Sequence, residues 1–216
     1  MGIATTLCLS LISAQALPFF NTSHHPPNER LQTGDIVFQD TGGAQGKAVS
    51  AATNSSFTHC GVIFEKAGKL YVFEAVQPVK IVTLETWKAR SKVFHARRLK
   101  DRTRIKTPPL WPKPHNGHNS HLGKNYDFKF RWSDDSLYCS ELVWKVYLRA
   151  TGIQICKLKT FSDYNLENKA AYKLIIKRYG SSKNLPLNEP VVAPSDLAES
   201  ALLTEVPRRL KKKWFR

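Results

Sequence analysis

Cys139 is the residue whose type and position most directly allow chemistry. It stands at the start of the segment 138–150, where Leu142, Val143 and Val146 recur with helical spacing. The free N–H groups and the positive dipole end of a helix N-terminus favour a thiolate over a thiol. The same spacing puts Cys139 on the apolar face of the helix, where a cysteine is often plain core filling. A catalytic role therefore requires a base close by.

His59 can supply that base. It lies in the predicted strand Thr58–Glu65, where alternating side chains put Cys60 and Val62 on one face and His59 and Gly61 on the other. This alternation predicts a buried, inert Cys60 and a His59 that looks onto a face kept open by Gly61. An imidazole there can take the thiol proton and later donate one to the leaving group. A hydrogen-bonded structural histidine is the alternative.

Glu74 is a carboxylate in the otherwise apolar predicted strand Leu70–Val76, and burying it is costly unless it has a partner. A hairpin centred near residues 66–67 would bring it beside His59. A two-residue turn predicts that the two lie directly opposite each other, whereas a three-residue turn puts Glu74 on the other face unless a bulge corrects the register. Two residues of the preceding strand are alternative orienting groups: Asp35 and Gln39.

The elements around these residues predict an antiparallel sheet with helices. Short runs of β-branched and aromatic residues between turn signals predict strands, and apolar residues with helical spacing predict helices. Strands are expected at 36–38, 58–65, 70–76, 79–83 and 93–99, and helices within 42–53 and at 84–90, 138–150, 166–179 and 196–203.

Two apparent motifs carry no chemistry. Gly46-Lys47 is not a P-loop, because the first glycine and the final Ser or Thr of that motif are missing. His115, His118 and His121 could chelate a transition metal, but no nearby carboxylate or thiol completes the ligand set. We therefore expect no metal and no cofactor.

Composition favours one basic, folded domain. The chain has 216 residues, 42% of them hydrophobic, which excludes a fully disordered protein, and its length fits a single domain with appendages. Its 33 Lys and Arg against 17 Asp and Glu give a net charge of +16, which favours anionic surroundings. A module that binds anionic membrane or nucleic acid is therefore a second hypothesis. No motif of a known nucleic-acid-binding fold is present, so no specific nucleic acid is expected.

The ends of the chain predict export. Residues 1–16 are uncharged, apolar in the centre and end Ala-Gln-Ala, which is typical of a signal peptide, although a buried N-terminal segment is the alternative. We expect a linker at 17–32, the domain at 33–206, a basic tail at 207–216, and a periplasmic or secreted location. The tail could contact an anionic surface or be a solvated end. Cleavage would leave three cysteines, so at least one thiol stays unpaired, and a Cys60–Cys156 bridge stays open.

Three motifs, taken in this order, resemble the NlpC-type papain-like cysteine hydrolases. They are Leu31–Phe38 (LQTGDIVF), Thr58–Val62 (THCGV) and Tyr138–Val143 (YCSELV). In the usual family order the cysteine helix comes first. Here it comes last, so the chain resembles the circularly permuted YiiX branch of that superfamily. Further segments are especially similar to that branch: Tyr71–Val76, Gly123–Phe128, Trp132–Asp135 and Trp144–Tyr147.

The resemblance implies an α+β fold of the permuted papain-like type, with an antiparallel sheet packed against the helix that carries the cysteine. It implies Cys139 as nucleophile, His59 as base and Glu74 as the residue that orients His59. Tyr126 matches a family tyrosine whose hydroxyl helps to stabilise the oxyanion, together with the backbone N–H of Cys139; a core aromatic is the alternative. Two further candidates for oxyanion stabilisation or substrate binding come from the matched motifs: Tyr138 and Asp35.

One region departs from that branch. A helix is expected before the Gly-x-x-Tyr-Asp motif, whereas Thr107–Ser120, within the irregular segment 101–123, is rich in Pro and His. The absence of that helix puts the stability of the fold and the shape of the substrate in doubt, but not the catalytic residues.

We therefore expect an exported thiol hydrolase that cleaves an amide or ester bond. The family makes a cell-wall peptide, or a related acyl-amino-acid substrate, the default. A lipid or acyl-ester hydrolase or acyltransferase of the same fold is the alternative, and an inactive basic module is the third. The oligomeric state stays open.

Overall fold

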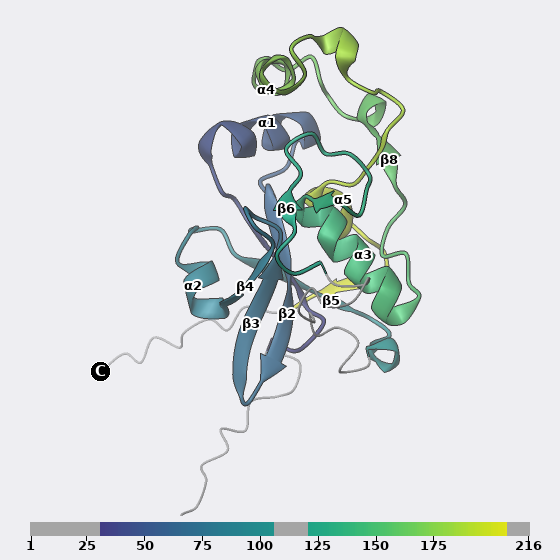
Figure 1. The fold of residues 1–216 in the computed structure, drawn as a ribbon. Coiled ribbons are helices and arrows are strands. Elements are labelled where there is room, and N and C mark those ends of the chain that lie inside the picture. Colours follow the sequence, from purple (N-terminus) through teal and green to yellow (C-terminus); the bar gives the residue numbers. More distant parts are fainter. Residues whose placement is uncertain (1–30, 106–120, 207–216) are drawn as a thin grey trace, which may run out of the picture.

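The computed structural model describes residues 31–105 and 121–206. In this part of the chain, six strands form an antiparallel sheet in the order β10-β5-β1-β2-β3-β4 (Figure 1). This arrangement confirms the α+β class and the antiparallel sheet. The strands are β1 (Ile36–Gln39), β2 (His59–Lys66), β3 (Lys69–Glu74), β4 (Lys80–Thr83), β5 (His95–Leu99) and β10 (Leu203–Glu205).

Helices cover both faces of the sheet. The strands alternate in side-chain direction, so Phe38, Cys60 and Val62 join a large core under α3 (Cys139–Thr151), as expected from the sequence. On the other face, Val37 and Ile63 pack with Trp87 in a smaller core. Trp87 belongs to the short helix α2 (Leu84–Lys88), which Thr83 caps by accepting a hydrogen bond from the Thr86 N–H at 3.2 Å.

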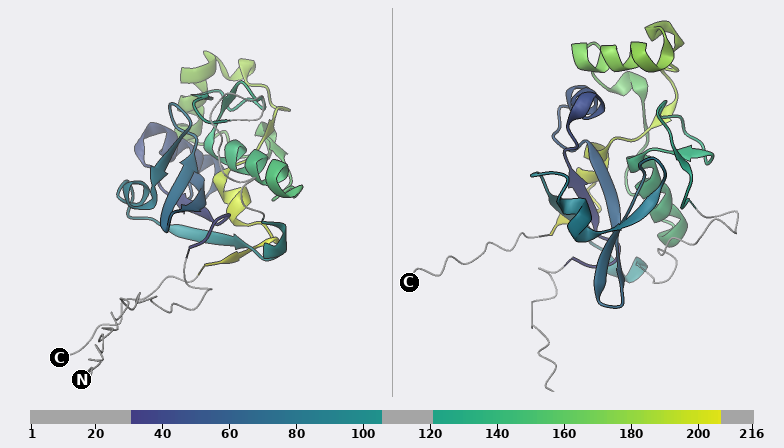
Figure 2. Two further views of the ribbon diagram at one scale, coloured as in Figure 1. Left: turned by 60° about the horizontal axis from the view of Figure 1, so that its bottom comes forward. Right: turned by 60° about the vertical axis from the view of Figure 1, so that its left-hand side comes forward.

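Two further helices stand together at one end of the sheet. α1 (Gly43–Thr53) and α4 (Lys169–Tyr179) contact each other, and both lie beyond the strand ends at the top of Figure 1 and of the right-hand view in Figure 2. The N-terminus of α3 points toward this end. Short elements complete the described part: η1 (Arg102–Arg104), β6 (Asn125–Tyr126), β7 (Ser136–Leu137), β8 (Lys159–Thr160), η2 (Phe161–Asp163), η3 (Ser182–Asn184), β9 (Pro190–Val191) and α5 (Pro194–Ala198).

The hairpin between β2 and β3 has a two-residue turn, but one position later than expected. The turn is Ala67-Gly68, so Glu74 falls opposite Gly61 in the register that pairs Val62 with Phe73. The expectation that Glu74 lies directly opposite His59 is therefore wrong. The shift is two residues along the pair, which keeps Glu74 on the same face as His59.

The C-terminal prediction of a helix at 196–203 is also wrong. The helix is α5, which begins at Pro194 and ends at Ala198, and Leu203 starts strand β10 on the edge of the sheet. Proline at the first helical position favours the earlier start, because its missing N–H has no intrahelical role there. Strand pairing between β10 and β5 then outweighs the helical spacing of the apolar residues in this segment.

Several predictions lie outside the described residues. They concern the signal peptide at 1–16, most of the linker at 17–32, the tail at 207–216, and residues 106–120, including His115 and His118. None of the helices in the described ranges is long and apolar enough to cross a membrane.

Gly61 tests the close packing of the central strands. A Cβ at this position would lie 2.5 Å from Val72 Cγ1 and 2.9 Å from the Phe73 carbonyl oxygen, which belongs to the backbone and cannot turn away. Gly61→Ala should therefore lower the free energy of unfolding by about 1–3 kcal/mol in urea denaturation. Gly46→Ala in α1 is the control, because its closest contact is the Thr41 hydroxyl at 3.3 Å, so its loss should be smaller. Equal stability of Gly61→Ala and wild type would contradict this packing.

Candidate active site

The start of α3 places the sulfur of Cys139. Tyr138 is the N-cap, and its N–H donates to the Glu141 carboxylate at 3.3 Å, which fixes the helix start immediately before Cys139. Lys145 holds the same carboxylate at 2.7 Å one turn later. Cys139 is the first helical residue and is only 4% exposed. The thiol therefore sits at the positive end of the α3 dipole and largely away from water.

His59 and Glu74 approach from the ends of two neighbouring strands. The Nε2 atom of His59 lies 2.7 Å from Glu74 Oε2, although their backbones are not directly paired. A Cβ at Gly61 would lie 3.5 Å from the Glu74 Cβ, so the glycine keeps the strand beside Glu74 free of a side chain. The imidazole also lies close enough to Cys139 that each group shifts the pKa of the other. The structure thus brings together the three residues expected to carry the chemistry.

Two residues of the α2 region complete this arrangement, and sequence reasoning missed both. Arg90 donates from Nη1 to Glu74 Oε1 at 2.5 Å, so the carboxylate is held between a guanidinium and the imidazole. The ring of Trp87 stacks on His59 with centroids 6.2 Å apart, and Trp87 is fully buried. The short helix at 84–90 was expected, but nothing in its pattern indicated which face of the sheet it covers.

Charge alternates along this chain of contacts. Burial acts to lower the pKa of His59, but hydrogen bonds and charges of Cys139 and Glu74 outweigh it and raise the value to about 9. Hydrogen bonding by Cys60, and then by His59, holds the pKa of Cys139 well below that of an ordinary thiol despite burial. Burial acts to raise the pKa of Glu74, but His59 and Arg90 together lower it. These shifts in pKa favour the thiolate form of Cys139 and the imidazolium form of His59.

Cys60 contributes more than its strand pattern predicts. It is fully buried, as expected, yet its thiol and its backbone both act to lower the pKa of Cys139. Burial, followed by the neighbouring Cys139, raises the pKa of Cys60 well above the usual value, so Cys60 stays a neutral donor. Cys60, Cys139 and Cys156 are all free thiols in the structure.

The two candidate tyrosines both lie beside Cys139. Tyr126 is 8% exposed, and its hydroxyl accepts a hydrogen bond from Gln45 Nε2 at 2.7 Å. The hydroxyl of Tyr138 accepts from the Val192 N–H at 3.2 Å, which leaves its ring as an apolar wall. Tyr126 therefore contributes a hydroxyl to the site, whereas Tyr138 contributes only the apolar surface of its ring.

Asp35 requires a correction. Its carboxylate is fully buried and receives two hydrogen bonds from Arg98, at 2.8 and 2.7 Å, at the end of β1 remote from His59. It neither orients His59 nor lines the site, because β1 runs antiparallel to β2 and puts Gln39, not Asp35, opposite His59. Gln39 is buried there, but its amide has no hydrogen-bond partner among the described residues, so Glu74 alone of the three expected groups bonds His59.

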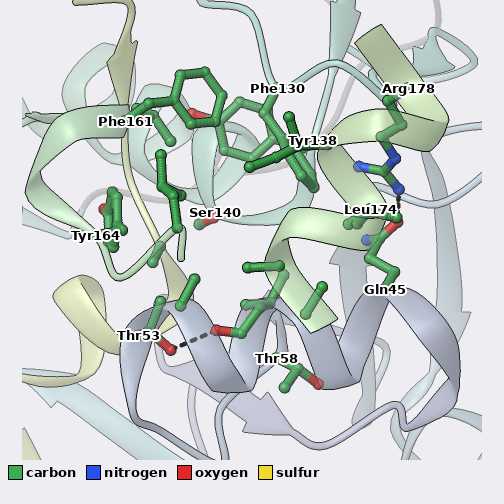
Figure 3. Close-up of a pocket in the computed structure, with 18 of the residues that line it drawn as sticks. Gln45, Thr53, Thr58, Phe130, Tyr138, Ser140, Phe161, Tyr164, Leu174 and Arg178 are labelled. Atoms are coloured by element: carbon green, nitrogen blue, oxygen red, sulfur yellow. Dashed lines mark hydrogen bonds between the residues drawn. The ribbon is translucent and has the colours of Figure 1, made fainter. Parts of the chain in front are cut away.

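An apolar pocket of about 100 Å³ opens beside Cys139 between α1 and α4 (Figure 3). Its wall is formed by aliphatic and aromatic side chains, and Figure 3 shows Phe130, Phe161 and Tyr138 gathered on one side. Cys139 and Tyr126 line this pocket, whereas His59 does not. Apolar wall residues from the two helices include Ala48, Val49, Ala52, Ala171, Leu174 and Ile175.

Residues 30–207 match the model of a family described as permuted papain-like amidases, YaeF/YiiX, C92 family. The chain belongs to this family. It is 37% identical over 179 residues to the uncharacterized protein YiiX of Escherichia coli K12, covering 82% of this chain and 86% of that protein. The family membership makes the protein a papain-like cysteine hydrolase of the amidase type with a permuted order of motifs.

A solved structure agrees with this fold. The crystal structure described as metalloprotein yiiX from Escherichia coli O157:H7 superposes with a TM-score of 0.73 at 38% identity, covering 82% of this chain and 97% of that one. In the described ranges of this chain, no group of three or more His, Cys, Asp or Glu side chains is placed to hold a metal ion. His121 instead contacts Arg149 through Nε2.

The thiolate can be tested by alkylation. Iodoacetamide should already label Cys139 rapidly at about pH 6, because the lowered pKa of Cys139 favours the thiolate, whereas an ordinary thiol needs a pH above about 8. Burial, followed by the charge of Asp196, raises the pKa of Cys156 to about 12, and Cys60 is raised as well, so neither should react. His59→Ala should abolish the labelling at low pH, and Cys139→Ala should show the background. A rate in wild type that rises only above about pH 8 would refute the ion pair.

The charge of Glu74 can be tested separately. Glu74→Gln keeps a hydrogen-bonding group but removes the negative charge that helps to raise the pKa of His59. The imidazolium is then less stable, so its support of the thiolate weakens and labelling at about pH 6 should slow by about ten-fold. Glu167→Gln, at an exposed site before α4, is the matched control and should label like wild type. Unchanged labelling of Glu74→Gln would show that its charge does not act on the pair.

Proposed function

We propose that the protein hydrolyses an amide bond of an acylated substrate through Cys139, His59 and Glu74. The observation that carries this proposal is the buried chain of contacts from the Cys139 sulfur through His59 to Glu74, closed by Arg90. The pKa shifts of these groups favour the charge states that nucleophilic catalysis by a thiolate requires.

In the first half of the reaction, the Cys139 thiolate attacks the carbonyl carbon and a C–S bond forms. The carbonyl π electrons move to oxygen, giving an oxyanion that accepts hydrogen bonds from the Tyr126 hydroxyl and the backbone N–H of Cys139. The oxyanion then collapses and the C–N bond breaks. His59 donates its proton to the departing nitrogen, which leaves as an amine.

In the second half, water attacks the thioester carbonyl. His59, now neutral, takes a proton from that water, and a second oxyanion forms in the same position. Its collapse breaks the C–S bond and releases the carboxylic acid, and the proton on His59 restores the thiolate–imidazolium pair. Glu74 keeps the ring oriented through Nε2, so the other ring nitrogen, Nδ1, serves the thiol.

The pocket beside Cys139 supports an acyl chain as the part of the substrate that stays bound to the enzyme after the amine has left. The leaving nitrogen must lie near His59 to receive its proton, so the acyl part extends to the other side of Cys139. The pocket is on that side, because Cys139 and Tyr126 line it and His59 does not. Within the range expected from the sequence, cell-wall peptides or acyl-amino acids, its apolar wall favours an aliphatic acyl group joined to an amino acid.

We also propose that the enzyme acts outside the cytoplasm. The support is the signal-peptide pattern of residues 1–16 and the positive charge, which suits anionic envelope material. The basic tail at 207–216 would supply contact with an anionic surface.

Acyl-chain length is the test of the substrate class. The value of kcat/KM for N-acyl amino acids should rise by about four-fold for each methylene, since burying one contributes about 0.8 kcal/mol, until the pocket is full. Ala52→Leu in the pocket wall should remove this gain for long chains and spare N-acetyl substrates. Ala51→Leu, one position along α1 and outside the lining, is the matched control.

Two results would overturn the proposal. Hydrolysis that persists in Cys139→Ala would exclude the thiol mechanism. Faster cleavage of a cell-wall stem peptide than of any N-acyl amino acid would leave the chemistry in place but refute the acyl substrate.

A further inference from the structure

A line of hydrogen bonds connects α4 and α1 to the hydroxyl of Tyr126. Arg178 of α4 donates from Nη2 to Gln45 Oε1 at 2.5 Å, and Figure 3 shows the two side chains meeting across the rim of the pocket. Gln45 of α1 then donates from Nε2 to the Tyr126 oxygen at 2.7 Å. None of the described elements that carry Cys139, His59 and Glu74 includes Gln45 or Arg178.

The chemistry of these groups fixes the direction of every bond. A guanidinium has donors and no acceptor, so the oxygen of the Gln45 amide must face Arg178. Its NH₂ group must then face Tyr126, whose oxygen accepts. The Tyr126 hydroxyl accepts a hydrogen bond from the amide, so its own proton stays free for another acceptor. Among the described residues, no acceptor receives a hydrogen bond from it. The proton is thus available beside Cys139, where Tyr126 lines the pocket.

We propose that Gln45 and Arg178 are positioning residues that hold the Tyr126 hydroxyl as a hydrogen-bond donor to the oxyanion. This inference rests on the proposed function, because it concerns the same intermediate. Arg178 fixes the orientation of the Gln45 amide, and Gln45 fixes the orientation of the Tyr126 proton. Neither residue touches the substrate carbonyl.

The surroundings strengthen the effect of this line of donors. Arg178 lies over the rings of Phe128 and Phe130, with its guanidinium carbon 5.7 and 4.7 Å from their centroids, so two cation–π contacts help to hold it in place. Burial and the neighbouring Cys139 raise the pKa of Tyr126, while Gln45 and Arg178 act in the opposite direction. The hydroxyl therefore stays protonated and polarised toward donation.

Gln45→Glu separates positioning from structure. The carboxylate has nearly the shape of the amide and keeps the contact with Arg178, so the helices stay together. It cannot donate to Tyr126, and it instead accepts the Tyr126 proton and turns it away from the oxyanion. With p-nitrophenyl octanoate as the probe, kcat and kcat/KM should both fall by about 100-fold, the cost of losing one oxyanion donor, while KM is unchanged.

A double-variant cycle decides whether Gln45 acts through Tyr126. Tyr126→Phe should lose about as much activity as Gln45→Glu, about 100-fold, and the double variant should lose no more than either single variant, because both remove the same donor. Losses that multiply in the double variant would overturn the proposal. So would wild-type activity of Gln45→Glu.

Controls keep the outcome distinct from misfolding and from failure of the proposed function. Gln154→Glu, at an exposed site after α3, adds the same charge and should retain full ester hydrolysis. Gln45→Met removes the donor without capturing the Tyr126 proton, so its loss should be smaller than that of Gln45→Glu; a larger loss would contradict the mechanism. Iodoacetamide alkylation involves no oxyanion, so Cys139 should label normally in each variant. Wild-type protein that neither labels at low pH nor hydrolyses the ester would refute the proposed function instead.

Discussion

The candidate site depends on one interaction, the ion pair that the pKa shifts of Cys139 and His59 favour in surroundings almost closed to water. A thiolate and an imidazolium lose hydration when they are buried, and their mutual attraction offsets that loss only when further groups satisfy the remaining donors and acceptors. The protein meets this requirement on both sides. Cys60 and the N-terminus of α3 stabilise the sulfur, and Glu74 with Arg90 stabilises His59.

This requirement explains why distant segments of the chain must meet at one end of the sheet. β2 supplies His59 and Cys60 from opposite faces of one strand, which is possible because the Cys139 sulfur lies close to the strand end. Gly61 allows β2 and β3 to pack closely there, because a Cβ at this position would meet Val72 and the Phe73 backbone. The permuted order of motifs makes no difference to this geometry, since the meeting of strand ends and helix N-terminus depends on packing and not on which element comes first in the chain.

The pocket and the catalytic groups divide the site into two sides. Helices α1 and α4 form an apolar wall on the side of Cys139 away from His59, and the polar line from Arg178 through Gln45 to Tyr126 runs along its rim. In the proposed function, the same two helices would therefore bind the acyl chain and orient the oxyanion donor.

The sequence by itself indicated Cys139, His59 and Glu74 as the candidate reactive residues and predicted the elements that carry them. The periodicity after Tyr138 placed Cys139 at a helix start, and strand alternation put Cys60 in the core, because both patterns are local properties of the backbone. Three things were decided by tertiary packing. The exact turn moved Glu74 opposite Gly61, the pairing of β1 with β2 took Asp35 away from the site, and the α1–α4 contact brought Gln45 and Arg178 to Tyr126. Register and helix docking depend on contacts between residues far apart in the chain, and no local pattern encodes them.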